Sequence, residues 1–277
     1  MLGMTTLVLG GTGKTGRRVV ERLTARGVPT RVGSRSGESP FDWQDEATWA
    51  PAVRGVTAAY ISFQPDLAIP GAAEAVGAFA RLAADSGVRR LVLISGRGEE
   101  GAQRGEEAIQ AAGADWTILR SSWFSQNFSE SFLLDAVRAG VVALPVDSVP
   151  EPFVDADDIA DAAVAALTEE GHAGEVYEVT GPRLLTFADA VGEIGRATGR
   201  DVRFVPVSLE NYTAELAAYE VPRDEIELLT FLFTEVLDGR NARLADGVQR
   251  ALGREPRDFT DFAREAASTG VWDVHVG

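Results

Sequence analysis

Residues 7–19 read LVLGGTGKTGRRV, and this stretch decides the fold. It begins with an apolar run typical of a buried strand and ends in an amphipathic helical pattern. Between the two lie Gly10, Gly11, Gly13 and Gly16, which fit both G-x-G-x-x-G and G-x-x-G-x-x-G. This spacing provides a tight turn and lets a helix pack closely on its strand. The stretch therefore predicts the first strand, turn and helix of a β-α-β unit.

A glycine loop in this context indicates a dinucleotide-binding site. The missing side chains let the backbone approach a pyrophosphate, and the helix N-terminus offers free N–H groups to its oxygens. A plain glycine-rich turn is the alternative, but it does not require a strand before it and an amphipathic helix after it. A Walker A loop is excluded, because the spacer from Gly10 to Lys14 is too short for that motif.

Short β-branched runs alternate with helical patterns through the first two-thirds of the chain. Strands are expected at residues 5–9, 30–33, 58–63, 90–95 and 116–120, and helices at about 71–85 and 105–112. Strands and helices that alternate at this spacing form parallel sheets covered on both faces. The sequence predicts an α/β fold with a doubly wound parallel sheet of the Rossmann type.

The pattern changes near residue 150. We expect a strand at 151–154, a helix at 158–167, a strand at 175–180 and mainly helical structure thereafter. These segments predict an NAD(P)-binding Rossmann domain over residues 1–150. They also predict a smaller, partly interleaved, mainly helical C-terminal substrate lobe over residues 151–277, with segments that return to the sheet.

The composition excludes several classes of protein. The chain has a formal net charge of −16, which disfavours binding to nucleic acid or anionic lipid, and it contains no Cys, which removes thiolate chemistry and disulfides. Its two histidines, His172 and His275, make a His-based metal site or catalytic triad improbable, and no metal is expected. No apolar run approaches the roughly 20 residues that span a bilayer, and the first residues resemble a strand more than a secretion signal. We expect a cytoplasmic protein.

The end of the second expected strand bears on the choice of dinucleotide. An NAD site places Asp or Glu there, on the ribose hydroxyls, whereas this chain has Ser34 and Arg35. A hydroxyl and a guanidinium suit the 2′-phosphate of NADP, and Lys14, the only lysine of the chain, adds a second cation from the loop. Alternatively, Arg35 is an ordinary solvated arginine. NADP(H) is favoured, and NAD(H) stays open.

The chain resembles the NmrA-like family of atypical short-chain dehydrogenase/reductases over nearly its whole length. The matching segments include residues 10–19, 41–43, 91–95, 116–120, 153–155 and 177–181. The resemblance implies a Rossmann domain, a small substrate lobe and a cleft between them. Members of the family include NAD(P)H:quinone reductases, reductases of aromatic natural products, and regulators that bind the dinucleotide without turnover.

The resemblance also implies roles for residues that match the family's motifs. It places these residues on the pyrophosphate: Gly10, Thr12, Gly13, Lys14, Thr15 and Gly16. It places Ser34 and Arg35 on the adenosine ribose, and Ser62, Phe63 and Gln64 beside the adenosine and nicotinamide riboses. Ser95 ends its strand where the family often has a serine near the nicotinamide.

The source of the proton is less evident. Conventional members of the superfamily use Tyr-x-x-x-Lys, in which the lysine lowers the pKa of the tyrosine, and none of the four tyrosines here is followed by that lysine. The candidates for a catalytic role are Ser95, Gln103 and Arg104, although a guanidinium is a poor acid and Ser95 would equally serve as a strand-end cap. Glu106 matches the family's recurrent glutamate. The proton must otherwise come from water or from the substrate.

An aromatic cluster follows the strand at 116–120, near the edge where parallel sheets bind their ligands. Trp123, Phe124 and Phe128, with Asn127 as a polar handle, would suit a flat apolar substrate. At least two of these four residues are expected to belong to the ordinary core. Asp155, Asp157 and Asp158 precede an apolar helix and are expected to cap it rather than to bind a metal.

Two functions follow from these features. The first is an NAD(P)H-dependent oxidoreductase, monomeric or homodimeric, that acts on an aromatic, quinone-like or polyketide-like molecule. This activity would suit antibiotic biosynthesis or similar natural-product tailoring, in a hydroquinone-forming or hydroxylation step. The second is a dinucleotide-sensing or partner-binding protein without turnover, which the missing Tyr/Lys pair favours.

Overall fold

The computed structural model describes residues 5–35, 37 and 39–274 of the chain. The chain divides into two compact units, each assembled from separate stretches of sequence. Unit 1 contains Met1–Ser121, Ala156–Val179 and Asp246–Glu255, and unit 2 contains Ser122–Asp155, Thr180–Ala245 and Pro256–Gly277. The division into domains at residue 150 stays a prediction.

Unit 1 contains a parallel sheet. In the described part of the chain it has seven strands in the order β3-β2-β1-β4-β5-β6-β8, and each neighbouring pair is parallel. The strands are β1 (Thr5–Leu9), β2 (Thr30–Ser34), β3 (Ser39–Pro40), β4 (Val56–Ile61), β5 (Arg90–Gly96), β6 (Asp115–Ser121) and β8 (Glu175–Val179). The order runs outward in both directions from β1 and β4, which confirms the doubly wound Rossmann-like fold.

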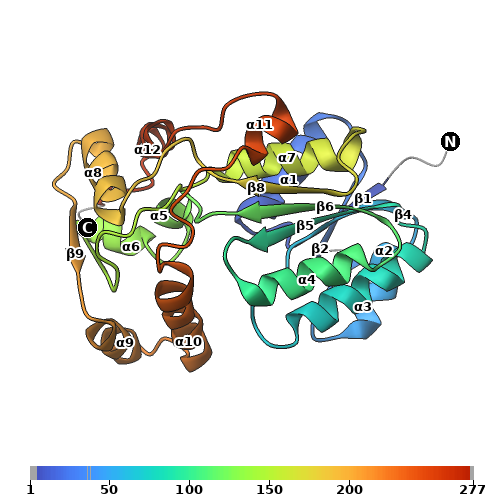
Figure 1. The fold of residues 1–277 in the computed structure, drawn as a ribbon, viewed down its shortest axis with the longest axis horizontal. Helices are drawn as coiled ribbons and strands as arrows, with labels where there is room; N and C mark the ends of the chain where they lie inside the picture. The colour runs from blue at the N-terminus through green and yellow to red at the C-terminus, as the bar shows by residue number, and fades with distance from the viewer. Residues whose placement is uncertain (1–4, 36, 38, 275–277) are drawn as a thin grey trace. The chain divides into compact units, whose positions relative to one another are not determined.

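Helices cover both faces of this sheet. They are α1 (Lys14–Ala25), η1 (Glu46–Thr48), α2 (Trp49–Val53), α3 (Ala72–Asp85), α4 (Glu100–Gln110), α7 (Ala156–Thr168) and α11 (Gly247–Leu252). Figure 1 shows α1 and α7 side by side on one face and α3 and α4 on the other. The right-handed crossovers that parallel strands require place helices in this way.

The core of unit 1 follows from alternation along the strands. Leu7 and Leu9 of β1 and Leu91 and Leu93 of β5 are fully buried and lie in one apolar cluster with Phe79 of α3. Successive side chains of a strand point to opposite faces, so these odd-numbered residues share the face that α3 and α4 cover. Ser95 continues the same odd-numbered series to the end of β5.

Unit 2 is mainly helical, as expected. Its elements are α5 (Asn127–Glu130), α6 (Leu134–Ala139), β7 (Val141–Leu144), α8 (Phe187–Thr198), β9 (Arg203–Pro206), α9 (Leu209–Ala218), α10 (Arg223–Phe231), the π-helix η2 (Leu232–Val236) and α12 (Phe259–Ser268). Among the described residues, β7 and β9 pair in parallel as a small second sheet. A capping box of Thr186 and Asp189 begins α8, and buried aromatic rings dominate the core.

Several predicted boundaries need correction. The strand predicted at 58–63 is β4, which begins at Val56 and ends at Ile61. The helix predicted at 105–112 is α4, which already begins at Glu100. The strand predicted at 151–154 is wrong, because only isolated bridges of Glu151 with Leu185 and of Val154 with Phe124 form there.

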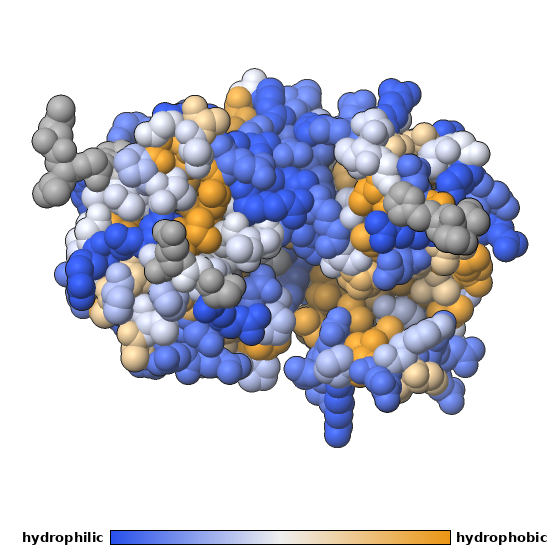
Figure 2. Space-filling view, turned by 180° about the vertical axis from the view of Figure 1, so that it is seen from behind, coloured by the Kyte–Doolittle hydropathy of each residue, from blue (hydrophilic) through white to orange (hydrophobic). Residues whose placement is uncertain are grey.

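The face drawn in Figure 2 is largely hydrophilic, with hydrophobic residues in scattered groups. Large apolar side chains that are exposed, among the described residues, belong to unit 2: Phe132, Val141, Leu184, Val205, Tyr219, Leu244 and Val274. Single exposed apolar residues are ordinary on protein surfaces. None of the helices in the described ranges is long and apolar enough to span a membrane.

Candidate functional site

The glycine loop between β1 and α1 brings the backbone of its first residues close to the backbone at the start of α1. Gly10 has a φ of +65°, and its carbonyl accepts a hydrogen bond from the Gly13 N–H at 2.9 Å. A Cβ added to Gly16 would lie 2.2 Å from the same Gly10 oxygen, closer than any side chain allows. Since α1 begins at Lys14, the loop delivers the N-terminal end of the helix to the carboxyl end of β1. This cradle fits a pyrophosphate, which needs N–H donors and bare backbone.

Thr15 connects the loop to the neighbouring strand. Its hydroxyl accepts a hydrogen bond of 2.8 Å from the Tyr60 hydroxyl of β4, and both side chains are buried. Burial raises the pKa of Tyr60, so the phenol stays protonated at neutral pH and serves as a fixed donor. The first turn of α1 is thus fixed against β4.

The expected adenosine end of the site lies at β2. The Gly10 N–H donates to the Gly33 carbonyl at 3.2 Å, which ties the glycine loop to the end of this strand. Ser34 is the last residue of β2 and is half-buried, and the Arg35 side chain that follows it is exposed. The two residues predicted to face the ribose therefore lie beside the glycine loop, with the guanidinium accessible to an anion.

On the other side of β1, the loop abuts the end of β4. A Cβ on Gly10 would lie 3.2 Å from the Cβ of Ser62, the buried residue that follows β4. The Ser62 carbonyl accepts a 3.3 Å hydrogen bond from the Trp43 indole. Phe63 is half-buried against Trp43, and Gln64 is exposed. These three predicted residues lie at the same carboxyl edge of the sheet as the cradle.

Ser95 lies at this edge too, and its hydroxyl has a buried partner. It donates a 2.6 Å hydrogen bond to Oε1 of Glu106, a residue of α4. Arg120 at the end of β6 holds the same carboxylate, through Nε to Oε1 at 3.0 Å and through Nη2 to Oε2. The bond to Glu106 raises the pKa of Arg120. The residue that matches the family's recurrent glutamate therefore contacts the predicted catalytic serine.

The other two predicted catalytic residues point away from Ser95. Gln103 and Arg104 lie on the exposed side of α4, whereas Ala102, Gly105 and Glu106 form its buried side. A helix with 3.6 residues per turn cannot turn all of these residues to one face. The structure thus brings Ser95 together with Glu106, and their catalytic roles stay predictions.

Asp66, in the loop after β4, and Glu99, in the loop after β5, form a carboxyl pair. Burial raises the pKa of Glu99 well above its ordinary value, and the charge of Asp66 raises it further. Burial also raises the pKa of Asp66, although hydrogen bonds from the Ala68 backbone and from Glu99 oppose the rise. The Glu99 carboxyl packs on Gly96, where an added Cβ would approach it to 2.2 Å. In the hydrogen bond between the two acids, Glu99 is the protonated donor and Asp66 accepts.

This pair predicts a dependence of stability on pH. Because the folded pKa of Glu99 is raised, its contribution is complete at pH values below the ordinary 4.5 and is lost as the pH rises through the folded pKa. Glu99→Gln removes that titration. We expect the melting temperature of the wild type to fall more between pH 5 and pH 8 than that of the variant, by about 2–4 °C.

Differential scanning calorimetry across this pH range measures the effect. Glu100→Gln, which changes the exposed neighbouring residue in the first turn of α4, is the matched control and should keep the wild-type slope. Equal slopes for the wild type and Glu99→Gln would show that Glu99 is not the group that titrates.

The predicted substrate residues follow β6 and belong to unit 2. Phe128 is fully buried, with its ring 5.7 Å from Phe153, 6.0 Å from Phe187 and 5.6 Å from Phe259. Trp123 is 9% exposed and also belongs to this core. Phe124 and Asn127 are half-buried. Phe128 therefore supports the core, as expected of some members of this set.

Two aspartates in the first turn of α7 pair with arginines, and a third lies just before the helix. Asp157 contacts Arg22 at 2.6 Å, and the fully buried Asp158 contacts Arg254 at 2.6 Å. Asp155 accepts a 2.7 Å hydrogen bond from Gln126. Each of these carboxylates thus has a polar partner within the protein, and the predicted capping role stays a prediction.

One of the two histidines, His172, lies within the described part of the chain. His172 is buried, and its Nδ1 lies 2.9 Å from the Tyr177 hydroxyl. His275 lies outside the described residues.

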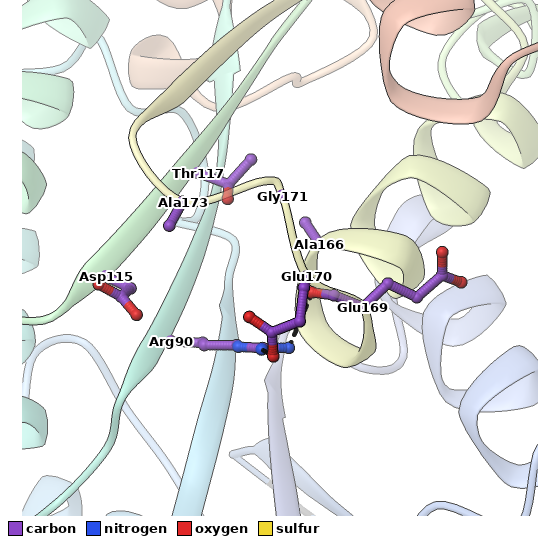
Figure 3. Close-up of a pocket in the computed structure, with 8 residues that line it drawn as sticks. All are labelled: Arg90, Asp115, Thr117, Ala166, Glu169, Glu170, Gly171 and Ala173. Carbon is purple, nitrogen blue, oxygen red and sulfur yellow. Dashed lines mark hydrogen bonds and ion pairs between the residues drawn. The ribbon is translucent and has the colours of Figure 1, made fainter.

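A small cavity lies at the opposite edge of the sheet. Figure 3 shows its lining side chains, among them Arg90 and Asp115, which are the first residues of β5 and β6. Arg90 forms an ion pair with Glu170 and a 2.9 Å hydrogen bond with the Glu169 carbonyl. Ligands of doubly wound folds bind at the carboxyl ends of the strands, so this cavity is not the candidate site.

Comparison with known proteins gives concordant results. A family model described as NAD(P)H-binding matches residues 10–170. Agroclavine dehydrogenase from Claviceps fusiformis is 31% identical over 292 residues, covering 97% of this chain and 99% of that protein.

Solved structures share the fold. The Citrobacter triphenylmethane reductase complexed with NADP(H) has a TM-score of 0.77 at 19% identity, over 95% of this chain and 100% of that one. The negative transcriptional regulator NmrA complexed with NAD has a TM-score of 0.72 at 15% identity, over 99% of this chain and 100% of that one. The NmrA-like resemblance of the sequence is confirmed, and the chain belongs to the NAD(P)H-binding family.

Proposed function

We propose that this protein is an NADP(H)-dependent oxidoreductase that reduces an aromatic, quinone-like or polyketide-like small molecule. The observation that carries the proposal is the bare backbone cradle, in which Gly16 lies against the Gly10 carbonyl at the N-terminus of α1. The phosphates of a dinucleotide can approach the backbone closely in such a cradle. The dinucleotide supplies a hydride to the substrate.

The relatives support the reductive activity. Agroclavine dehydrogenase is similar over nearly the whole of both chains, and triphenylmethane reductase shares the fold. The names of both proteins refer to polycyclic or multiply ringed compounds. A comparable ring system would suit the aromatic residues predicted here, of which Trp123, Phe124 and Asn127 are the candidates for substrate contact.

Different residues of the chain bind different parts of the dinucleotide. Gly10, Gly13 and Gly16 leave room for the pyrophosphate, and Arg35 pairs with the 2′-phosphate. Since the tyrosines lack the Tyr-x-x-x-Lys arrangement, no residue pair of that kind donates a proton. A quinone tolerates this, because its reduced oxyanion is stable enough to take a proton from water.

Oxidation of NADPH in the presence of quinones and polyketide-derived aromatic ketones tests the proposal. We expect a loss of absorbance of NADPH above the background rate with at least one member of the panel. Tight NADPH binding without turnover across a broad panel would contradict the reductase and favour the dinucleotide-sensing alternative. Absence of dinucleotide binding would contradict both.

Arg35→Ala tests the choice of cofactor. The exposed guanidinium should form charge-assisted hydrogen bonds with the 2′-phosphate, so its loss should weaken NADPH binding at least about tenfold and leave NADH binding nearly unchanged. Titration calorimetry measures both affinities. Arg26→Ala, at the far end of α1 in a surface ion pair with Glu169, is the control. Equal losses for NADPH and NADH would remove Arg35 from the 2′-phosphate site.

A further inference from the structure

Ser95 lies in a row of polar residues that crosses three strands. In the register of the sheet, Ser95 of β5 is paired with Arg120 of β6, and Arg120 is paired with Glu178 of β8. Glu106 of α4 lies over this row and contacts both Ser95 and Arg120. The Ser95 hydroxyl is therefore bonded to Glu106 of α4, and Arg120 of β6 holds the same carboxylate.

Each charge in this group is matched. Glu106 is 3% exposed and receives two bonds from the Arg120 guanidinium. Arg120 also contacts Glu178 at 3.4 Å, and Nε of the buried Arg97 bonds Glu178 at 3.1 Å. Two guanidinium groups and two carboxylates thus alternate across the end of the sheet. The Glu106 carboxylate is thus the acceptor in a two-bond ion pair with Arg120.

An ionised carboxylate accepts hydrogen bonds and cannot donate them. The 2.6 Å contact between Ser95 Oγ and Glu106 Oε1 must therefore use the hydroxyl hydrogen of Ser95. The serine oxygen keeps two lone pairs, which accept hydrogen bonds. Toward any ligand at this edge, Ser95 offers an acceptor.

The sheet order locates the part of the dinucleotide that reaches this acceptor. The phosphate cradle follows β1, and Arg35, the candidate for the adenosine ribose, follows β2 on one side of it. On the other side come β4 and then β5, each roughly 4.8 Å further along the sheet. A dinucleotide that crosses the carboxyl edge would have its nicotinamide half over β4 and β5, where Ser62 and Ser95 lie.

We propose that Glu106 and Arg120 are positioning residues that make Ser95 a hydrogen-bond acceptor for the carboxamide N–H of the bound nicotinamide. This inference rests on the proposed function. It removes Ser95 from the candidates for proton donation, because its hydrogen is held by Glu106. It also gives Ser95 a role in fixing the orientation of the nicotinamide ring.

Two analogues of NADP⁺ test the acceptor directly. The 3-acetylpyridine analogue replaces the carboxamide NH₂ with a methyl group, whereas the thionicotinamide analogue keeps the NH₂ and changes the carbonyl oxygen to sulfur. The wild type should bind the acetylpyridine analogue about tenfold more weakly than NADP⁺ and the thionicotinamide analogue nearly as well. Ser95→Ala should abolish this preference. Titration calorimetry measures the affinities.

A double-mutant cycle tests the positioning role. Glu106→Gln should reduce the preference for NADP⁺ over the acetylpyridine analogue, because an amide no longer forces the orientation of the serine hydroxyl. In the Ser95→Ala background, Glu106→Gln should have no further effect on this ratio. Glu107→Gln, which changes the exposed neighbour on α4, should leave the ratio unchanged. A purely structural role of Glu106 predicts no such non-additivity.

ADP-ribose 2′-phosphate, which lacks nicotinamide, separates this inference from the proposed function. Every variant should bind this fragment as the wild type does, which also reports that the unit is folded. If the wild type binds NADP⁺ and the acetylpyridine analogue equally, or if the effects of Ser95→Ala and Glu106→Gln on the ratio add, the inference is wrong while the proposed function stands. If the wild type binds neither NADP⁺ nor the fragment, both are wrong.

Discussion

Gly16→Ala is expected to weaken NADPH binding by about 100-fold or more and to lower the melting temperature. The added Cβ would lie 2.2 Å from the Gly10 carbonyl oxygen, 2.7 Å from the Gly10 carbonyl carbon and 2.9 Å from the Gly11 Cα. All three atoms are backbone, so no side-chain rotation relieves the contact. The loop must move away from α1, and overpacking of this kind costs about 1–3 kcal/mol or more.

The same movement of the loop also displaces the backbone groups that would bind the pyrophosphate. NADPH affinity should therefore fall by more than the loss of folding stability alone explains. The Gly13 N–H now bonds the Gly10 carbonyl at 2.9 Å, and displacement of Gly10 disturbs the donors at the start of α1. Gly192→Ala in α8 is the control, since its added Cβ would meet its nearest neighbour, a flexible Arg196 nitrogen, at 3.5 Å. Alanine is the better helix former there, so this variant should melt at or above the wild-type temperature.

Fluorescence titration with NADPH measures the affinity of both variants, and thermal melts measure their stability. A Gly16→Ala protein with wild-type affinity would mean that the glycine serves only the turn and that phosphates do not approach the loop.

The glycine loop could be predicted from sequence because its signal is local. A strand, a turn and a helix within residues 7–19 each have their own pattern, and the structure has β1 and α1 at these places. The end of β2 was also predicted to within one residue, because the strand expected at 30–33 ends at Ser34.

The start of α4 could not be predicted in the same way. The sequence pattern predicts this helix at about 105–112, whereas α4 begins at Glu100. In the structure two glycines lie within α4 because of close packing: an added Cβ would lie 2.3 Å from the Ala68 carbonyl at Gly101 and 2.8 Å from Leu67 at Gly105. The reason for these glycines is a tertiary contact, which a local pattern does not contain.

The sequence gives only a weak indication that Glu106 is the partner of Ser95. Glu106 is the one acid on the buried side of α4, between Ala102 and Ile109, so its position on an otherwise apolar face pointed to a specific role. Its bonds to Ser95 and Arg120 depend on the register of β5 with β6, which the sequence does not specify. The location of the serine was predictable, and its hydrogen-bonding state was not.

The aromatic residues after β6 show another limit of prediction from sequence. Trp123, Phe124 and Phe128 have the same chemical character in the sequence, and only their packing separates core from candidate surface. Phe128 is enclosed, whereas Phe124 is half-buried. Residue type alone does not distinguish a ring that binds substrate from one that supports the fold.

Phe128→Ala is expected to destabilise the protein by about 3–5 kcal/mol, the range for truncation of a fully buried phenylalanine. The ring has three aromatic neighbours within 5.6–6.0 Å, and the cavity left behind would lose their edge contacts. The backbone carbonyl of the same residue accepts a 2.8 Å hydrogen bond from the buried Trp272 indole. Collapse of the cavity would strain that bond, which limits how far the core can relax.

Chemical denaturation of the variant, together with its NADPH affinity and substrate KM, separates the two roles that this ring could have. A core residue lowers the denaturation midpoint and leaves NADPH affinity unchanged, because the glycine loop belongs to unit 1. Phe132→Ala is the control: its ring is 36% exposed and lies 6.4 Å from Trp123, so we expect a change of about 1 kcal/mol or less. An unchanged midpoint with a raised KM would instead identify Phe128 as a substrate contact, since only a ring that touches the ligand affects binding without affecting stability.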